Sequence, residues 1–497
     1  MFDTAEIAHE VDKATWKAEE PPLRQALLDA QFELQKQRRF PVLILIGGAE
    51  GAGKSETVNL LNEWMDPRHI VTHAFELMSD EEHERPYMYR FWRQLPPKGR
   101  IGIFFGAWHS QPILERAFGR ITRAEVDQRI AEVDRFEQML ADEGVLLLKF
   151  WFHLTRDQQK ARLEELASKK STRWRVGEHE WDFFKRYDEL AEASEHFVRA
   201  TSTGYAPWYV VNGRDERYRG LTVGKTLLAA MQSRLAEQPG AEPPAEKPPP
   251  LLPAVDGRNV LRALELDQQM DEEKYDKLLE KWQGRVNLLS RDPRFRRMSV
   301  VAVFEGNDAA GKGGAIRRVT GAIDARYVRP IPIAAPTEEE KDQPYLWRFW
   351  RQLPRWGRVA IFDRSWYGRV LVERVEGFAP QEAWMRAYQE INDFEQELVH
   401  SSAVLVKFWL AISKEEQLRR FQEREDTPHK RFKITEEDWR NREKWNDYEQ
   451  AVCDMVDRTS TTEAPWTLVE ANNKLYARIK VLKTLARAIE AGLERVG

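Results

Sequence analysis

The sequence predicts an α/β protein in which one doubly wound, mostly parallel sheet domain occurs twice along the chain. The first observation is a repeat: landmarks recur at an interval of 258 residues (312 − 54), so that Lys54 and Lys312 close two glycine-rich loops. At the same interval, the heptapeptide RFWRQLP begins at both Arg90 and Arg348. The second observation is that short apolar runs alternate with long amphipathic stretches, which is typical of parallel strands joined by helices.

The apolar runs are interpreted as buried strands of a parallel sheet, because they are short and apolar throughout. They are Val42–Ile46, Val300–Phe304, Val359–Phe362, Val404–Trp409 and Thr467–Val469. Among the amphipathic stretches, helices are predicted at Gln381–Leu398 and Lys414–Arg424, and charged packing helices at Leu23–Arg39 and Asp267–Leu289 precede the two sheets.

A proline-rich run separates the two copies. Residues 238–253 read QPGAEPPAEKPPPLLP, a composition that cannot pack a core and favours an extended, semi-stiff linker. We therefore predict a first domain at residues 1–237, a linker at residues 238–254 and a second domain at residues 255–497.

Composition excludes several classes of protein. A chain of 497 residues is too long for one core, and 42% apolar with 32% charged residues is typical of a soluble globular protein. The net charge of −4 disfavours nucleic-acid and membrane-surface partners. Cys453 is the one cysteine, which excludes a disulfide framework and favours a cytoplasmic location. No apolar run approaches membrane-spanning length, and the acidic N-terminus lacks the pattern of a signal peptide.

The two glycine loops have the Gly-x4-Gly-Lys pattern of a P-loop, or Walker A motif, and each lies between a predicted strand and a predicted helix. Backbone amides of such a loop face an anion, and the lysine reaches it. Each domain is therefore predicted to be P-loop kinase-like. In the second copy, phosphate is expected to meet Lys312 and the four glycines Gly306, Gly311, Gly313 and Gly314.

A second motif follows the predicted strand at Val359–Phe362. Asp363 lies at the carboxyl end of this strand, where ligands bind in open α/β sheets and where a carboxylate can hold Mg²⁺. Arg364 and Arg369 are expected near the transferring phosphoryl group. The structural alternative is an ion pair between Asp363 and Arg364 at the strand end.

The first copy lacks these charges although its apolar landmarks remain. The pairs of second-copy and first-copy residues are Asp308/Glu50, Arg317/Asn59, Asp363/Phe105, Arg364/Gly106, Tyr367/His109, Arg369/Gln111, Arg424/Leu166 and Lys430/Thr172. Because the fold does not depend on residues that one copy has lost, we predict a catalytic second domain and a degenerate first domain.

The metal site is expected to rely on carboxylates. A P-loop usually places Ser or Thr after its lysine as a Mg²⁺ ligand, whereas the second copy has Gly313. Asp308 and Asp363 are therefore the predicted ligands. Glu373 is a weaker candidate, since Glu115 keeps a carboxylate at this position in the degenerate copy.

A basic cluster follows the predicted helix at Lys414–Arg424. Arg420, Arg424, Lys430 and Lys433 belong to it and are interpreted as a mobile helical lid that closes over a polyanion. The alternative is a solvated helix face. Arg374, in the motif after the strand, is a further candidate for phosphate binding.

Together, the loop Gly306-x-Asp308-x-x-Gly-Lys312-Gly-Gly and the motif DRSWYGRVLVERVEG at residues 363–377 resemble the polyphosphate kinase 2 family, and its fused two-domain members most closely. The resemblance covers essentially the whole chain. It implies Mg²⁺-dependent transfer of the terminal phosphoryl group of inorganic polyphosphate to AMP, forming ADP. It also implies functional roles for Asp308, Lys312, Asp363 and Arg364.

Two alternatives remain open from the residues themselves. An ATP-dependent kinase of nucleoside monophosphates would use the same loop. A non-catalytic, nucleotide-binding interaction protein would use the first copy, whose loop keeps Lys54 and Ser55. Two homologous domains in one chain resemble a fused dimer, and a homo-oligomer is also open.

Overall fold

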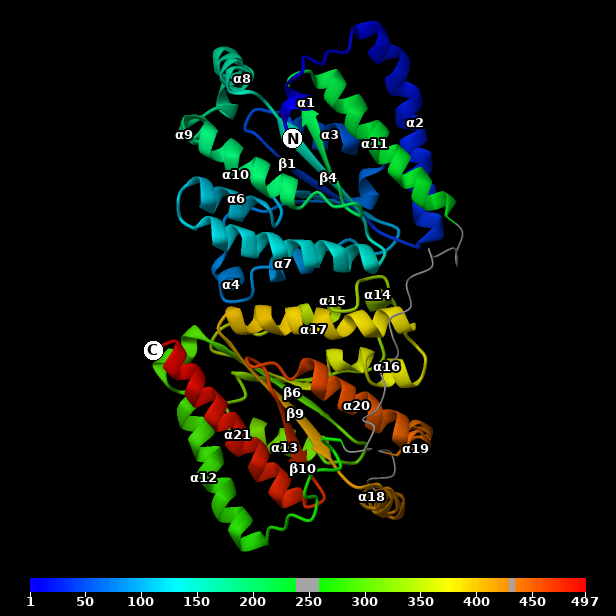
Figure 1. Ribbon diagram of the computed structural model, residues 1–497, viewed down its shortest axis with the longest axis vertical. Coiled ribbons are helices and arrows are strands. Elements are labelled where there is room, and N and C mark those ends of the chain that lie inside the picture. The colour runs from blue at the N-terminus through cyan, green and yellow to red at the C-terminus, as the bar shows by residue number, and fades with distance from the viewer. Residues whose placement is uncertain (238–258, 429–433) are drawn as a thin grey trace. The chain divides into compact units, whose positions relative to one another are not determined.

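The computed structural model describes residues 1–237, 259–428 and 434–497, which divide into two compact units (Figure 1). One unit contains most of the residues before the predicted linker, and the other contains most of those after it. The predicted linker at residues 238–254 lies outside the described residues, as do Lys430 and Lys433 of the predicted lid.

Each unit contains a parallel sheet of five strands. The first sheet has the order β2-β3-β1-β4-β5, with strands β1 Val42–Gly48, β2 Ile70–Ala74, β3 Ile101–Phe105, β4 Leu146–His153 and β5 Trp208–Asn212. The second has the equivalent order β7-β8-β6-β9-β10, with strands β6 Ser299–Gly306, β7 Val328–Pro332, β8 Val359–Asp363, β9 Ala403–Ala411 and β10 Trp466–Glu470. The predicted α/β fold, present twice, is confirmed.

Helices connect the strands in both units. Before residue 238 they are α1 Asp3–Glu6, α2 Lys13–Gln37, α3 Lys54–Trp64, α4 Asp80–His83, α5 Tyr89–Trp92, α6 Ser110–Ala117, α7 Arg123–Asp142, α8 Arg156–Ser168, α9 Glu178–Lys185, α10 Tyr187–Ala200 and α11 Glu216–Ala236. After residue 258 they are α12 Glu272–Ser290, α13 Lys312–Thr320, α14 Glu338–Lys341, α15 Trp347–Trp350, α16 Val372–Val375, α17 Gln381–His400, α18 Lys414–Asp426, α19 Glu436–Glu443, α20 Trp445–Thr459 and α21 Lys474–Arg495.

Three elements differ from the sequence prediction. Helix α12 begins at Glu272 rather than at Asp267. Helix α2 begins at Lys13 rather than at Leu23, and its N-terminal half includes Pro21 and Pro22. Strand β7 has no apolar run and contains Pro330 and Pro332, residues that interior strands exclude because proline cannot donate to the ladder. Proline is tolerated in β7 because this strand lies at the edge of its sheet.

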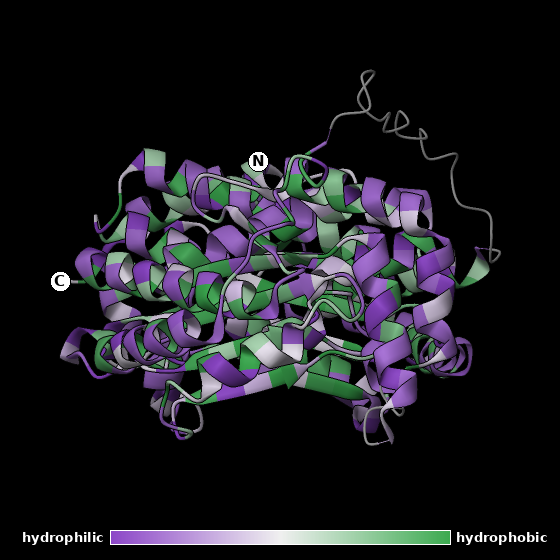
Figure 2. Cartoon of the chain, turned by 90° about the horizontal axis from the view of Figure 1, so that it is seen from below, coloured by the Kyte–Doolittle hydropathy of each residue, from purple (hydrophilic) through white to green (hydrophobic). Residues whose placement is uncertain are grey.

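Helices cover both faces of each sheet, since successive side chains of a strand point to opposite sides. In the second unit, Val406 and Phe408 of β9 join the core formed with α13 and α21, whereas Lys407 pairs with Glu395 of α17 on the other face. Figure 2 shows the strands as mainly hydrophobic and the helices as mixed.

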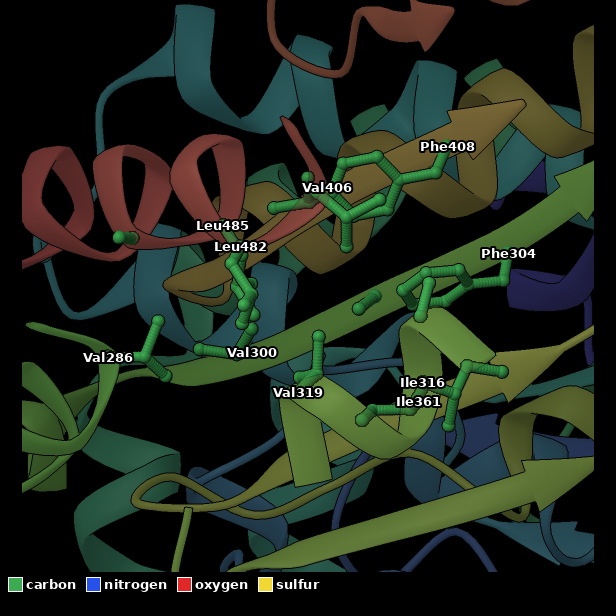
Figure 3. Packing of buried hydrophobic residues seen from close by; sticks show 14 of the residues in the cluster. Val286, Val300, Phe304, Ile316, Val319, Ile361, Val406, Phe408, Leu482 and Leu485 are labelled. Atoms are coloured by element: carbon green, nitrogen blue, oxygen red, sulfur yellow. The ribbon is translucent and has the colours of Figure 1, made fainter. Parts of the chain in front are cut away.

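The core of the second unit holds the central strand β6 rigidly beneath the glycine loop. Figure 3 shows side chains of β6 and β9 meeting those of helices α13 and α21. The contributing residues include Val286, Val300, Phe304, Ile316, Val319, Ile361, Val406, Phe408, Leu482 and Leu485. Because each is largely or fully buried, the end of β6 is a fixed platform for the loop that follows.

None of the helices in residues 1–237, 259–428 and 434–497 combines the length and the apolar character that crossing a membrane requires.

Candidate active site in the second unit

The glycine loop of the second unit connects the end of β6 to the start of α13. Gly306 has a φ of 149°, and a Cβ there would lie 2.4 Å from the carbonyl oxygen of Leu410. Glycine is therefore required by both the backbone angle and the close approach of β9. Lys312 is the first residue of α13, and its Nζ donates to the carbonyl oxygen of Gly306 at 2.7 Å. The loop thus presents a helix N-terminus and a lysine together, as predicted for an anion site.

A cavity of about 90 Å³ lies beside this loop. Its wall brings together charged, polar and aromatic residues from three separate places in the chain. These include Glu305, Asp308 and Lys312 from the loop region, Arg364 from the end of β8, and Glu437, Asn441, Trp445 and Tyr448 from α19 and α20. Three of the four residues predicted to be catalytic line this cavity, and Asp363 is the exception.

Arg364 is held in an unusual backbone conformation. Its φ is 63°, in the left-handed region, which costs about 1–2 kcal/mol for a residue with a Cβ. Its counterpart in the first unit is Gly106, with a φ of 70° and no such penalty. The same turn is therefore built in both units, and the second unit accepts strain in order to keep a guanidinium there. Strain of this kind is common at functional sites.

The guanidinium of Arg364 faces the loop aspartate, with 3.6 Å between its Nη2 and Oδ1 of Asp308. The other carboxylate oxygen of Asp308 accepts a hydrogen bond from Nδ2 of Asn441 at 2.9 Å. The carbonyl oxygen of Asp308 also accepts from Nε2 of Gln417 at 3.2 Å. Helices α18 and α19 are therefore tied to the loop through Asp308. The side chain of Arg364 remains 49% exposed, so the pair itself adds little stability and leaves the guanidinium open to an anion.

Asp363 ends β8 and lies in register with Phe304 of β6, one strand away from the loop. Its carbonyl oxygen accepts from the amide of Ile333 at 3.0 Å. Among the described residues its carboxylate has no hydrogen-bond or ion-pair partner. A strand-end carboxylate without a structural partner is chemically suited to a metal or a metal-bound water. The predicted alternative, an ion pair of Asp363 with Arg364, does not form: Arg364 pairs with Asp308 instead.

The carboxylates predicted to hold Mg²⁺ are those of Asp308, which lines the cavity, and Asp363, which lies at the adjacent strand end outside its lining. No group of three or more metal-ligating side chains occurs within the part of the chain that the structure describes. This is compatible with Mg²⁺, which commonly binds through one or two carboxylates and keeps several waters. The chemistry of the two carboxylates therefore fits the ion.

Glu305 is a site residue that the sequence prediction missed. Its carboxylate is buried and accepts a hydrogen bond from Oγ of Ser365 at 2.8 Å. Burial raises the pKa of Glu305, and the nearby charge of Lys312 opposes the shift. The signal was present in the internal repeat, because Gly47 and Ala107 replace Glu305 and Ser365 together in the first copy.

A buried polar network anchors the turn after Arg364. The carboxylate of Glu395 accepts hydrogen bonds from Nε1 of Trp366 at 3.0 Å, from Oη of Tyr367 at 2.6 Å and from Nζ of Lys407 at 2.7 Å. Lys407 also donates to the carbonyl oxygen of Thr459. Because every one of these groups is buried, the network fixes the position of the strand-end motif.

Two predicted phosphate ligands have other partners. Arg420 is 2% exposed, and its guanidinium donates to the carbonyl oxygens of Ala309, Ala471 and Asn472 at 2.7–2.9 Å. Arg420 therefore stabilises the glycine loop by hydrogen bonding to its backbone. Arg374 donates to Oη of Tyr388 at 2.9 Å and pairs with Asp454 at 2.7 Å, so its charge is used within α16, α17 and α20.

The remaining candidates lie outside the lining of the cavity. Arg369 pairs with Glu373 at 3.2 Å, Arg317 is exposed on α13, and Arg424 is partly buried on α18. Asn441 and Tyr448 line the cavity but were not predicted. They could have been found in the repeat, since Phe183 and Leu190 replace them in the first copy.

Comparison with known proteins gives consistent matches to one family. The family model described as polyphosphate kinase 2 matches residues 10–239 and again residues 269–495. A Pseudomonas aeruginosa protein named polyphosphate:AMP phosphotransferase is 57% identical over 497 residues, 100% of each chain. A protein of the same name from Acinetobacter johnsonii is 37% identical over 94% of this chain and 95% of its own. A crystal structure of a candidate polyphosphate kinase 2 from Pseudomonas aeruginosa PA01 matches with a TM-score of 0.90 and 56% identity, covering 100% of both chains.

Proposed function

The chain belongs to the polyphosphate kinase 2 family, and we propose that it transfers the terminal phosphoryl group of inorganic polyphosphate to AMP, forming ADP. The substrates are those in the names of its full-length relatives. The observation that carries the proposal is the arrangement of Lys312, Asp308 and Arg364 around one cavity. Two cations and a loop of backbone amides suit a ligand made of linked phosphates.

The second unit is the proposed catalytic unit, and the first is the proposed degenerate one. The support is that Arg364, Asp363 and Glu305 correspond to Gly106, Phe105 and Gly47 at the interval of 258 residues (363 − 105). The first unit keeps the same sheet order and its loop lysine. A P-loop alone is therefore not sufficient for the proposed reaction.

In the proposed reaction, an oxygen of the AMP phosphate attacks the terminal phosphorus of polyphosphate. A new P–O bond forms as the bond to the next phosphate breaks, so the polyphosphate becomes one unit shorter. The attacking oxygen is already ionised at neutral pH, and a strong general base is unnecessary. Catalysis then depends on positioning and on stabilising charge.

Each residue at the loop has a distinct proposed role. Lys312 and the loop amides hold the donor phosphates, and Arg364 contacts the transferring group, where its exposed guanidinium can turn from Asp308 to phosphate oxygens. Asp308 and Asp363 would hold Mg²⁺, which, when bound, neutralises charge between donor and acceptor. Arg420 and Asn441 keep the loop and α19 in place.

The donor can be tested by phosphorus NMR on the full-length protein. With AMP, Mg²⁺ and long-chain polyphosphate, we expect the β-phosphate signal of ADP to appear while ATP as the donor gives little ADP. Chelation of the metal with EDTA should stop the reaction, and added Mg²⁺ should restore it. ADP formation from AMP with ATP as donor, and none with polyphosphate as donor, would instead assign an ATP-dependent nucleoside-monophosphate kinase.

The strand-end carboxylate can be tested in the same assay. Asp363→Asn should abolish transfer while the thermal unfolding temperature stays unchanged, because no described residue uses this carboxylate structurally. Near-normal turnover of Asp363→Asn would remove Asp363 from the mechanism.

A further inference from the structure

The first unit contains a cavity at the position that corresponds to the candidate active site, and its chemistry is different. Its volume is about 290 Å³, compared with about 90 Å³ in the second unit. Both cavities adjoin the glycine loop, and both include the loop lysine, Lys54 or Lys312. Loss of phosphotransfer residues from the first unit has therefore left an enlarged cavity rather than a filled one.

The first cavity has lost polar groups and gained apolar ones at equivalent positions. Asp363, Asn441 and Tyr448 of the second unit correspond to Phe105, Phe183 and Leu190 in the first. All three apolar replacements line the first cavity. Further rings come from Phe2, Phe75 and Trp151, so that aromatic side chains from several elements surround the space. Such walls suit a flat ring that packs against them.

The loop lysine of the first unit is already neutralised. Nζ of Lys54 donates to the carbonyl oxygen of Gly48 at 2.8 Å and to the carboxylate of Glu50 at 2.9 Å. The charge of Lys54 lowers the pKa of Glu50, so this carboxylate stays ionised. In the second unit, by contrast, the equivalent Asp308 faces Arg364. The cation that the loop offers to the first cavity, Lys54, is thus compensated by Glu50, and a phosphorylated ligand that pairs with Lys54 would have to displace this carboxylate.

His109 is a buried polar side chain in the wall of this mainly apolar space. It lines the cavity, it is 1% exposed, and neither ring nitrogen has a hydrogen-bond partner among the described residues. Burial lowers the pKa of His109 to about 3, so the ring is neutral and carries one donor and one acceptor. Buried polar atoms are rarely left without partners, and a ligand is one way to supply them.

Two neighbours explain why His109 is unpartnered. Its counterpart Tyr367 reaches the buried carboxylate of Glu395, whereas no hydrogen bond joins the shorter His109 ring to Glu137, the equivalent carboxylate. A Cβ on Gly47 would lie 2.7 Å from Nε2 of His109, so glycine at this position makes room for the ring. The imidazole is therefore held at the cavity wall instead of in the network behind it.

We propose that the cavity of the first unit binds an uncharged purine nucleoside or free purine base, with His109 at the hydrogen-bonding edge of the ring. A volume of about 290 Å³ lies at the small end of ligand sites, which fits a molecule of this size. The site is distinct from the proposed phosphotransfer site and takes no part in the chemistry. It does not depend on the identity of the phosphate donor.

The test is calorimetric titration of the full-length protein with adenosine, and separately with guanosine, in the presence of saturating AMP. AMP occupies the second unit, and its charge disfavours it in the first. We expect one nucleoside to bind per chain. No binding of either nucleoside at millimolar concentration, or simple competition by AMP, would overturn the proposal.

Two cavity-filling variants locate the binding. Ala191→Phe and Ser194→Leu place extra atoms in the first cavity from α10, and each should weaken nucleoside binding at least tenfold. Their rate of ADP formation should stay within twofold of wild type, which also reports that the protein is folded. Unchanged nucleoside affinity in both active variants would place the binding elsewhere and contradict the proposal.

The contribution of His109 is tested by the nucleoside affinity of two variants at this position. His109→Phe keeps a ring but removes both nitrogens, and should weaken nucleoside binding about tenfold, whereas His109→Gln should recover part of the affinity. Glu50→Gln frees Lys54, and should allow a second AMP per chain to bind. Equal nucleoside affinity in His109→Phe and wild type would exclude His109 from the site.

Discussion

The two units share the same fold, and each has a P-loop. The cavity beside the loop has several charged side chains in the second unit, whereas in the first unit its wall is mainly apolar and aromatic. Lys54 and Lys312 stand at the same point of identical sheets, but Lys54 is paired with Glu50, whereas Lys312 has no ion-pair partner among the described residues. The difference teaches that the P-loop supplies a place for an anion. Whether the P-loop takes part in phosphoryl transfer depends on the side chains that neighbouring strands and helices add beside it.

The turn after the strand shows this difference most sharply. Gly106 and Arg364 adopt the same left-handed conformation, and only the second unit accepts the strain of a side chain there. A residue kept against its backbone preference indicates a function that offsets the cost.

The largest effect is expected for Arg364→Gly, which gives the second unit the residue of the first. Loss of a guanidinium at a transferring phosphoryl group should lower kcat/KM for ADP formation by about 10³-fold. Relief of the left-handed strain should raise the free energy of unfolding by about 1 kcal/mol. The matched control is Gly106→Arg, which should lower stability and leave activity within twofold. A variant Arg364→Gly with normal activity would remove Arg364 from the reaction.

The second effect is a dependence of stability on pH that arises from His109. Its pKa falls from 6.5 to about 3 on folding, so the neutral buried ring contributes stability above pH 6.5 that is progressively lost as pH falls toward 3. At pH 5 this loss is about 2 kcal/mol, because each pH unit below 6.5 costs about 1.4 kcal/mol.

This pH effect can be measured by thermal unfolding of full-length protein at pH 7 and pH 5. The loss between the two pH values should be smaller in His109→Phe than in wild type. Ile113→Val shortens another buried side chain in the wall of the same cavity and removes no titratable group, so it is the matched control and should leave the pH dependence unchanged. Equal pH dependence in wild type and His109→Phe would contradict the burial of a neutral ring.

A smaller effect is expected for Asn441→Ala. This change removes the hydrogen bond from Nδ2 of Asn441 to Asp308, and hydrogen bonds to charged groups contribute about 1.5–3 kcal/mol. We expect kcat/KM to fall about tenfold, because Asp308 loses its fixed orientation. Phe183→Ala, at the equivalent position of the first unit, should leave kcat/KM unchanged; an equal fall in both variants would point to general destabilisation.

Much of the fold was predictable because each central strand is a short apolar run, and the repeat marked the same runs twice. Lys312, Asp308 and Arg364 were predictable as neighbours, since all follow the carboxyl ends of adjacent parallel strands. The edge strand β7 was not, because Pro330 and Pro332 remove its strand signal.

The rest of the site depends on long-range packing that residue type does not show. Asn441 reaches Asp308 across 133 residues of chain, through the fold of α18 and α19. Arg420 belongs to a basic cluster in the sequence, but only the structure shows its guanidinium buried against carbonyl oxygens. Glu305 directly follows an apolar run, and this position in the sequence does not by itself indicate a buried carboxylate.

The most direct test of the difference between the two units is a matched pair of lysine variants in the full-length protein. The measurement is kcat/KM for ADP formation from AMP and polyphosphate in Lys312→Ala and Lys54→Ala. We predict a loss of about 10³-fold for Lys312→Ala, because the cation that holds the donor phosphates is removed, and a change below twofold for Lys54→Ala. A comparable loss in both variants, or a larger one in Lys54→Ala, would contradict the assignment of catalysis to the second unit.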